Sequence, residues 1–235
     1  MQRLPEPELM DDALQARAYA AADFSTSDQA LVDTVLERLA TVWPQDPDRP
    51  ERIVDLGCGP GNISFRLAQA CPDATVLGLD GAAAMLELAD QRRQNDPYPW
   101  TGLRFQLACL PLTPGALEKL PGAWRPPFTT LVSNSLLHHL HDPQVLWRTL
   151  RQLGAPGALV VVRDLRRPRD QESLEALVVR HAAGAPAVLQ RDYALSLRAA
   201  FRADEVAAQL LAAGLQELTV RELGDRYLEV VGRLA

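Results

Sequence analysis

The sequence has few cysteines, no excess of positive charge and no long apolar run. Its three cysteines, Cys58, Cys71 and Cys109, are widely spaced and form no CxxC pair. This argues against a disulfide framework or a zinc ribbon and favours a reducing cytoplasm. The formal net charge of −6 disfavours a nucleic-acid partner, because phosphate binding requires a basic surface.

Targeting segments are also missing. No apolar run approaches the length of a membrane span, and residues 1–12 lack the basic start and apolar stretch of a secretory signal. We therefore expect a cytoplasmic protein without a membrane partner. At 235 residues, 47% of them hydrophobic, the chain is expected to form one domain with a sizeable core.

What the sequence does contain is a regular alternation of short apolar strands and helical segments. This pattern predicts a parallel sheet covered by helices on both faces. The connection between the last two strands is so short that the final strand is expected to run antiparallel. The predicted fold class is therefore α/β, a doubly wound, mostly parallel, seven-stranded Rossmann-like sheet with its last strand reversed.

The expected strands are 52–56, 74–79, 103–107, 128–132, 158–162, 215–221 and 226–231. The expected helices are 8–22, 27–42, 62–70, 82–95, 113–120, 142–153, 170–183 and 203–213. Three prolines in WPQDPDRP, residues 43–50, predict a linker. We divide the single domain 1–235 into N-terminal helices that form a candidate lid (1–49), a core (50–165) and a C-terminal part with covering helices and the last strand pair (166–235).

The turn after the first expected strand has the composition of a ligand-binding loop. In IVDLGCGPGN, residues 53–62, Gly57, Gly59 and Gly61 permit a tight turn and a close approach of the backbone to a ligand. The helix behind them presents unpaired N–H groups, which favour an anion. The alternative is that the glycines only shape a turn.

Asp80 ends the next expected strand, in VLGLDG. An acidic side chain at this place in a doubly wound sheet can accept both hydroxyls of a ribose. The alternative is that Asp80 only caps the helix that begins near Gly81. The two features on consecutive strand ends together favour a nucleoside ligand.

The glycine spacing and Asp55 narrow the choice of nucleoside. A dinucleotide loop reads GxGxxG, whereas this loop reads GxGxG, which disfavours a nicotinamide oxidoreductase. Asp55, inside the strand before the loop, would repel a pyrophosphate but suits an ammonium group. A ligand with an amine and a carboxylate at one end and a ribose at the other is S-adenosylmethionine.

At these residues the chain resembles the class I S-adenosylmethionine-dependent methyltransferases. VDLGCGPG, the acidic GLD after the second strand and SNSLLHHLHDP (133–143) occur in the order and spacing of that superfamily. The resemblance is strong over residues 50–165 and extends to the C-terminus through AAFRADEVAAQLLAAGL. It implies a small-molecule methyltransferase with S-adenosyl-L-methionine as its cofactor.

The resemblance also assigns positions. The glycine loop would wrap the methionine part, Asp80 would hold the ribose, residues after the third strand would border the adenine, and residues after the fourth would line the transfer site. This chain lacks the aspartate that many members carry after the third strand, so a backbone carbonyl is the candidate adenine partner. The implied cofactor residues are Asp55, Gly57, Cys58, Gly59, Gly61, Asp80, Gly81, Ala108, Cys109, Ser133 and Asn134.

Three histidines follow the fourth expected strand. His138, His139 and His141 are too close in sequence for the usual spaced set of metal ligands, and no Cys or Glu pair accompanies them, so we expect no metal. His141 lies at the start of the next helix and is expected to be exposed. One of His138 and His139 is expected to pack as a satisfied core histidine, and the other is a candidate general base. Methyl transfer does not always require one, since it depends on alignment and desolvation.

Candidate acceptor-binding residues lie outside these motifs. Arg163, with Arg166, Arg167 and Arg169 behind it in RDLRRPRD, is expected to clamp a carboxylate or phosphate; a solvated basic loop is the alternative. Tyr19 lies on the candidate lid, where ordinary helix packing is the alternative. Tyr193 and Arg198 lie in the segment that usually covers the acceptor in this family.

The leading hypothesis is therefore methyl transfer from S-adenosylmethionine to N, O or S of a small, polar or anionic metabolite by in-line displacement. One alternative is a methyltransferase that acts on tRNA or protein, which the acidic charge disfavours for tRNA. Another is a nucleoside-binding protein without catalysis. Nothing in the sequence identifies the acceptor or sets the oligomeric state.

Overall fold

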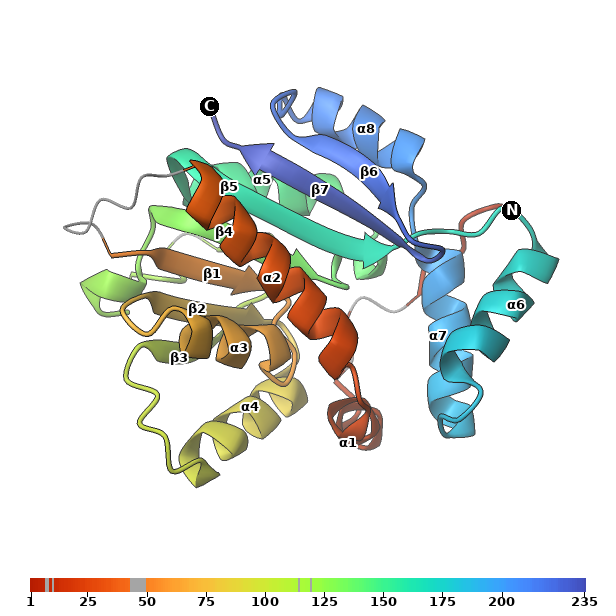
Figure 1. The fold of residues 1–235 in the computed structure, drawn as a ribbon, viewed down its shortest axis with the longest axis horizontal. Helices are drawn as coiled ribbons and strands as arrows, with labels where there is room; N and C mark the ends of the chain where they lie inside the picture. Colours follow the sequence, from red (N-terminus) through yellow and green to blue (C-terminus); the bar gives the residue numbers. More distant parts are fainter. Residues whose placement is uncertain (7–8, 10, 43–49, 114, 119) are drawn as a thin grey trace.

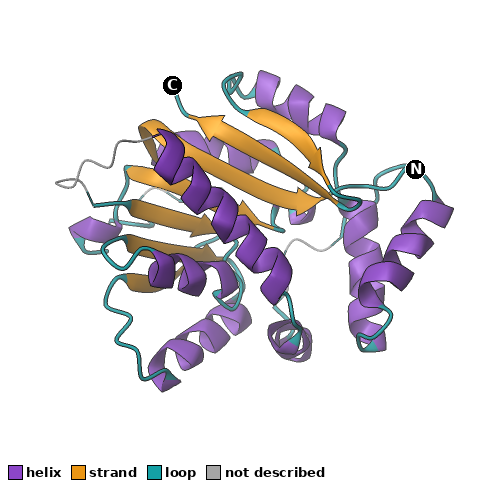
Figure 2. Cartoon of the chain, in the orientation of Figure 1, coloured by secondary structure: helices purple, strands orange, loops and turns teal. Residues whose placement is uncertain are grey.

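The computed structural model describes residues 1–6, 9, 11–42, 50–113, 115–118 and 120–235. A seven-stranded sheet lies at its centre, with the strand order β3-β2-β1-β4-β5-β7-β6 (Figures 1 and 2). The strands are β1 (Arg52–Leu56), β2 (Thr75–Asp80), β3 (Leu103–Leu107), β4 (Phe128–Asn134), β5 (Gly154–Leu165), β6 (Thr219–Leu223) and β7 (Tyr227–Arg233). The predicted fold class is confirmed.

The direction of the strands also agrees with the sequence pattern. β7 pairs antiparallel with both β5 and β6, while β1 to β5 form parallel pairs. The order turns back between β1 and β4, which are neighbours although two strands separate them in sequence. At such a switch point the loops after the two strands diverge and leave a crevice at their carboxyl ends.

Helices cover both faces of the sheet. They are α1 (Ala13–Ala21), α2 (Ser25–Val42), α3 (Asn62–Ala70), α4 (Ala83–Asn95), α5 (Gln144–Leu153), α6 (Gln171–Ala182), α7 (Ala187–Ala199) and α8 (Ala203–Ala212), with short 3-10 turns η1 (Gly122–Trp124) and η2 (Leu137–His139). α2 and α3 bury Leu31 and Phe65 on one face, while α5 and α8 bury Trp147 and Val206 on the other (Figure 1).

Several predicted boundaries differ from the structure. The sequence does not predict α7 as a helix. β5 is longer than expected at both ends and extends to Leu165 because it pairs with β7 at seven positions. The first helix begins at Ala13, after Asp12 accepts hydrogen bonds from the backbone N–H groups of Leu14 and Gln15. Within the predicted helix 113–120, residues 115–118 form turns. The predicted linker lies, at 43–49, outside the described residues.

Three helices stand beyond the carboxyl ends of the parallel strands. α1 contacts both α4 and α7, and α6 packs against α7 (Figure 1). Together α1, α6 and α7 form a cover over the crevice at the switch point.

Among the described residues, none of the helices has the length and apolar character of a membrane span.

Candidate active site

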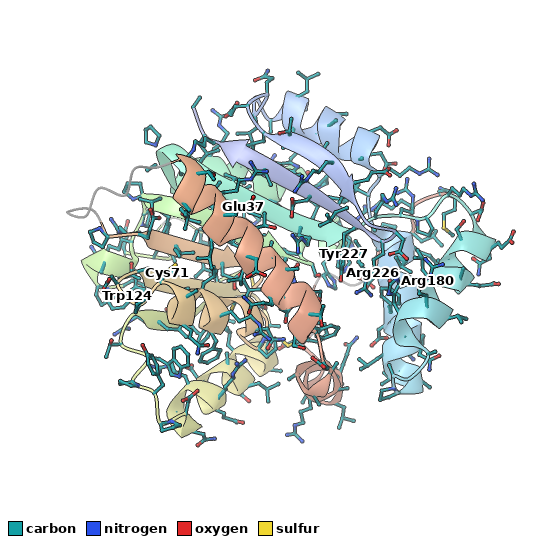
Figure 3. The ribbon with its side chains drawn as sticks, viewed as in Figure 1. Glu37, Cys71, Trp124, Arg180, Arg226 and Tyr227 are labelled. Atoms are coloured by element: carbon teal, nitrogen blue, oxygen red, sulfur yellow. The ribbon has the colours of Figure 1, made fainter. Side chains whose placement is uncertain are left out.

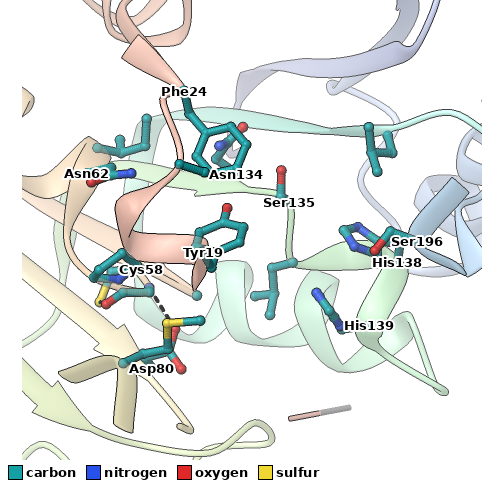
Figure 4. Close-up of a pocket in the computed structure, with 18 of the residues that line it drawn as sticks. Tyr19, Phe24, Cys58, Asn62, Asp80, Asn134, Ser135, His138, His139 and Ser196 are labelled. Carbon is teal, nitrogen blue, oxygen red and sulfur yellow. Dashed lines mark hydrogen bonds between the residues drawn. The ribbon is translucent and has the colours of Figure 1, made fainter. Parts of the chain in front are cut away.

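A cavity of about 630 Å³ occupies the crevice between the strand ends and the covering helices. We call its two parts the strand end and the helical end. The strand end is lined by Asp55, Gly57, Cys58, Gly59, Asp80, Gly81, Ala108, Cys109 and Asn134, among others. The helical end is lined by Tyr19, His138, His139, Tyr193, Ser196, Arg226 and Tyr227, among others. In Figure 4, Cys58 and Asp80 lie on one side of Tyr19, and His138, His139 and Ser196 lie on the other.

The glycine loop forms the predicted tight turn. The N–H groups of Gly57 and Cys58 both donate to the Leu79 carbonyl, at 2.8 and 3.0 Å. Gly57 has a φ of +71°, and a Cβ there would lie 2.9 Å from Cβ of Leu136. Both the backbone angle and the close approach of Leu136 therefore require glycine at this position.

Asp55 presents a buried carboxylate to the strand end. Its Oδ2 accepts a hydrogen bond of 2.6 Å from the Ser64 hydroxyl, while Oδ1 has no hydrogen-bond partner among the described residues. Burial raises the pKa of Asp55 to about 7, against the opposing effect of the Ser64 bond. A buried carboxylate oxygen without a partner is costly, and an ammonium group in the cavity would satisfy it.

Asp80 has the capping role that the sequence allowed, and its geometry leaves room for the ribose contact. Its Oδ1 accepts from the N–H of Ala82 at 2.8 Å, as a helix cap would, and its Oδ2 accepts from the N–H of Gly59 at 2.7 Å. Burial raises the pKa of Asp80, while these backbone bonds oppose the shift. Each carboxylate oxygen has a further lone pair, so the side chain can accept ribose hydroxyls without losing either bond.

Asp28 is a lining residue that the sequence reading missed. It lies in the first turn of α2, lines the cavity and is only 4% exposed. Burial raises its pKa to about 6. Asp28, Asp55 and Asp80 together make the strand end acidic, which suits a ligand that carries both an ammonium and a sulfonium group.

The remaining predicted cofactor residues divide into two groups. Ala108 and Cys109 follow β3 and line the cavity, and the Ala108 N–H donates to the Asp80 carbonyl at 2.8 Å. Gly61 and Ser133 are not among the lining residues. A Cβ on Gly61 would lie 2.7 Å from the Phe105 ring, so this glycine serves packing.

Ser133 lies behind the cavity wall. It is buried, and its hydroxyl donates to the Leu56 carbonyl at 2.9 Å, between β4 and β1. Side chains alternate along a strand, and the next residue, Asn134, lines the cavity instead. The sequence could not tell which residue of the pair faces the cavity.

The histidines at the helical end form a compact group with two carboxylates. His138 is 3% exposed, with Nδ1 2.5 Å from Oδ1 of Asp164 and Nε2 3.4 Å from Oε1 of Glu6. His139 Nδ1 lies 3.3 Å from the same oxygen. Burial acts to lower the pKa of His138, but Asp164 and Glu6 outweigh it and raise the pKa above its usual value.

These positions bear on the predictions for the three histidines. His138 is the buried, satisfied histidine that was expected, although it also lines the cavity. His141 is exposed, as expected, and its ring nitrogen lies 2.8 Å from the Glu6 carbonyl. Glu6 itself was not predicted, because no local pattern in the N-terminal segment signals its place beside histidines so distant in sequence.

The structure does not place Arg163 at the cavity. Arg163 is paired directly with Glu229 in the register of β5 and β7, and its guanidinium donates to Glu229 Oε2 at 2.5 Å. It also contacts α2 through the Thr34 hydroxyl at 3.1 Å. Burial acts to raise the pKa of Glu229, but bonds from Arg163 and Arg221 hold it below its usual value. Arg163 is therefore part of the packing between the sheet and α2. The prediction that it contacts the acceptor is not supported, because its side chain does not line the cavity.

The other predicted arginines are also engaged away from the cavity. Arg166 pairs with Glu222, and Arg167 pairs with Glu205 at 2.5 Å. Arg169 pairs with its neighbour Asp170, and Arg198 donates to Gln171 at 3.2 Å. None of these arginines lines the cavity.

Arg226, in contrast, does line the cavity. It immediately precedes β7, and its guanidinium lies 4.7 Å from the Tyr227 ring centroid; Figure 3 shows the two beside α7. In the described part of the chain, no carboxylate pairs with it within 4 Å. Burial raises the pKa of Tyr193, and the adjacent Arg226 guanidinium opposes the shift.

The fold and the strand end define the class of protein. A seven-stranded sheet with β7 reversed, a glycine loop after β1 and an acid after β2 are combined with an acidic cavity of the size of a nucleoside ligand. A family model described as a methyltransferase domain matches residues 54–160. The sequence match over residues 54–160 and the fold are those of a class I S-adenosylmethionine-dependent methyltransferase, a class whose cofactor is S-adenosylmethionine.

Individual relatives support this assignment. A trans-aconitate 2-methyltransferase from Deinococcus radiodurans is 39% identical over 117 residues, 49% of this chain and 39% of that protein. A malonyl-(acyl-carrier protein) O-methyltransferase from Legionella pneumophila is 33% identical over 112 residues, 47% of this chain and 35% of that protein. The match thus spans less than half the length of these relatives.

Solved structures are similar over nearly the whole chain. An S-adenosylmethionine-dependent methyltransferase from Aquifex aeolicus has a TM-score of 0.62 at 16% identity, covering 94% of this chain and 98% of that chain. The plantazolicin methyltransferase BpumL in complex with S-adenosylhomocysteine has a TM-score of 0.65 at 11% identity, covering 95% and 91%. At such identities these likenesses show the fold.

Proposed function

We propose that this protein transfers a methyl group to a carboxylate oxygen of a small, anionic metabolite. The observation that carries the proposal is Arg226, a cation at the helical end of the cavity without a carboxylate partner among the described residues. A guanidinium binds a carboxylate through paired hydrogen bonds. The names of the relatives, trans-aconitate 2-methyltransferase and malonyl-(acyl-carrier protein) O-methyltransferase, also denote acids.

The strand end would bind the cofactor and the helical end would bind the acceptor. S-adenosylmethionine supplies a methyl group that is activated by its positively charged sulfur. Asp55 would hold the ammonium group, Asp80 the ribose hydroxyls, and the backbone around Ala108 the adenine. Arg226 and the Tyr193 hydroxyl would hold an acceptor carboxylate at the helical end, so that the acceptor carries the negative charge and the strand end the complementary acids.

A carboxylate acceptor changes the role expected for the histidines. A carboxylate is already deprotonated near neutral pH, so its oxygen needs no general base. The protein then contributes alignment of the acceptor and exclusion of water from the site. Tyr19 and Phe24, whose ring centroids are 4.8 Å apart, both line the cavity and would cover it from the side of α1.

The test is transfer from labelled S-adenosylmethionine to a panel of small di- and tricarboxylic acids, with their amides as neutral controls. We expect methyl esters of the acids only. Arg226→Gln should raise the acceptor KM by about 10- to 100-fold, the loss of a charge-assisted contact, and leave cofactor affinity unchanged. Arg198→Gln is the matched control, since Arg198 lies on α7 away from the cavity. Equal turnover of acids and amides would refute the proposal.

We propose the cytoplasm as the compartment and a small molecule as the partner. All three cysteines are free thiols, which suits the predicted reducing cytoplasm. The acceptor is proposed as a small molecule, without nucleic acid, because the cavity that holds Arg226 is enclosed by the covering helices.

A further inference from the structure

Methyl transfer to a carboxylate leaves the group of Glu6, His138 and His139 without a chemical role. We propose that these three side chains bind a divalent transition-metal ion, best matched by Zn²⁺, at the helical end of the cavity. The expectation of no metal rested on the close sequence spacing of the histidines. Glu6 supplies the third ligand from the N-terminal segment, where local spacing could not reveal it.

The distances within the group fit a metal better than hydrogen bonds. Oε1 of Glu6 lies 3.4 Å from Nε2 of His138 and 3.3 Å from Nδ1 of His139, and the ligand atoms all lie within 4.8 Å of one another. N–H···O hydrogen bonds are normally about 2.7–3.2 Å long. Tetrahedral zinc bonds of about 2.0–2.2 Å separate neighbouring ligand atoms by roughly 3.4 Å.

Neighbouring groups orient the ligands. Nδ1 of His138 faces Asp164 at 2.5 Å, which directs Nε2 toward Glu6; a carboxylate behind a ligating histidine is a regular feature of metal sites. The Ser196 hydroxyl donates to Oε1 of Glu6 at 3.0 Å. Two carboxylates thus surround two imidazoles, and a divalent cation would balance their charge.

The backbone around Glu6 is anchored independently of any ion. The Arg3 guanidinium donates to the carbonyls of His138 and Leu140 at 3.1 and 3.0 Å and to the Ala199 carbonyl at 2.6 Å. The Leu4 N–H donates to the Arg198 carbonyl at 3.1 Å. The N-terminal segment is therefore fixed on both η2 and α7, and Glu6 is held in place as a ligand must be.

The ion would be open on one side. His138 and His139 both line the cavity (Figure 4), whereas Glu6 is not among its lining residues. The site is therefore closed on the Glu6 side. Zinc with three protein ligands keeps a fourth position for water or a substrate oxygen. Binding of an acceptor oxygen at that position would depend on the proposed function. Binding of the ion itself does not depend on it.

The test is a titration of the metal-free 235-residue protein with Co²⁺, followed by displacement with Zn²⁺. We expect one equivalent of Co²⁺ with the visible absorption of a four-coordinate site, and its loss on addition of Zn²⁺. His139→Ala and Glu6→Gln should weaken binding by more than the roughly 10- to 100-fold expected for Asp164→Asn, which changes only the carboxylate behind His138. His181→Ala is the control, because His181 also lines the cavity and faces a carboxylate, Asp225, at 2.9 Å.

Folding of each variant is checked by its melting temperature without metal. Zn²⁺ should raise the melting temperature of the wild type and of His181→Ala, because an ion that binds the folded state stabilises it, and should not raise that of His139→Ala. Absence of stoichiometric binding, or equal affinity in His139→Ala and the wild type, would overturn the metal site and leave the group as hydrogen-bonded ion pairs. Metal binding without methylation of any acid would refute the proposed function alone.

Discussion

The two ends of the cavity are built in different ways. Apart from Asp28 on α2, the strand end consists of the carboxyl ends of β1, β2, β3 and β4 and the loops that follow them, so each of these contributions is a short stretch of sequence at a strand end. The helical end collects single side chains from α1, η2, α7 and the start of β7. Backbone geometry determines the first, and long-range packing determines the second.

This difference explains which end is common to the superfamily and which end can set specificity. A glycine turn and an acid at a strand end recognise groups that every S-adenosylmethionine molecule carries. Isolated side chains such as Arg226 and Tyr193 can change without disturbing the sheet, because they lie on covering helices and at a turn. Loops and covers of this kind carry function on a constant scaffold.

The largest expected effect tests whether Arg163 belongs to the scaffold. Arg163→Ala should lower the free energy of unfolding by about 3 kcal/mol, because it removes one partner of a buried ion pair formed with fully buried Glu229. Denaturant unfolding measures this change. Arg221→Ala is the control and should cost much less, since Arg221 is largely exposed. If the Arg163→Ala variant is as stable as the wild type but has a raised acceptor KM, Arg163 binds the acceptor and is not part of the scaffold.

Asp80→Ala tests the strand end. It should weaken cofactor binding by about 1–3 kcal/mol, the cost of leaving ribose hydroxyls unpaired. Calorimetry with S-adenosylhomocysteine measures the change, with the melting temperature as a check on folding. Unchanged affinity in a folded variant would mean that Asp80 serves only the N–H groups of Gly59 and Ala82.

The raised pKa of Asp55 predicts a pH dependence of cofactor binding. Asp55 must be ionised to hold an ammonium group, and its pKa is about 7 in the free protein. Affinity should therefore rise by about 5- to 10-fold between pH 6 and pH 7.5. Asp55→Asn should bind more weakly, with a flatter profile. A wild-type affinity that does not change across this range would remove Asp55 from the ammonium site.

The free energy of unfolding of the ligand-free protein should change with pH in the opposite direction, because of Asp55 and Asp28. The folded-state pKa values of Asp55 and Asp28, about 7 and about 6, lie above the ordinary 3.8. The folded protein therefore binds more protons than the unfolded chain between about pH 4 and pH 7, and its stability falls as pH rises through that window. Thermal unfolding from pH 5 to pH 8 measures this, and Asp55→Asn should flatten the decline.

The smallest effect concerns the cover of the helical end. Tyr19→Ala should lower kcat several-fold by admitting water and loosening the acceptor, while Tyr19→Phe, which keeps the ring, should retain most of the rate. Single-turnover kinetics with the acceptor identified from the acid panel measures both. Identical rates in all three proteins would show that α1 does not close over the reacting groups.

The sequence predicted the sheet, its reversed last strand and most of the strand end because these depend on local signals. Apolar runs define β1 and β2, glycines define the turn, and Asp80 follows at a fixed place. It did not predict α7 as a helix, and it did not show which of Ser133 and Asn134 faces the cavity, since that depends on the orientation of the last two residues of β4.

The helical end could not be predicted in the same way. Arg163 and Arg226 are both arginines near a strand end, and only the pairing of β5 with β7 shows that Arg163 faces Glu229. Glu6 reaches His138 because Arg3 fastens the N-terminal segment to η2. Neither the Arg163–Glu229 contact nor the Glu6–His138 contact can be recognised from the spacing of residues in the sequence.

The strand end is expected to bind S-adenosylmethionine rather than a dinucleotide. Isothermal calorimetry of the purified protein with S-adenosylmethionine, S-adenosylhomocysteine and NAD at the same pH tests it directly. We expect one molecule of either S-adenosyl compound to bind per chain, each more tightly than NAD. Tighter binding of NAD would contradict the account, because the GxGxG turn and the acid Asp55 would then have failed to exclude a pyrophosphate.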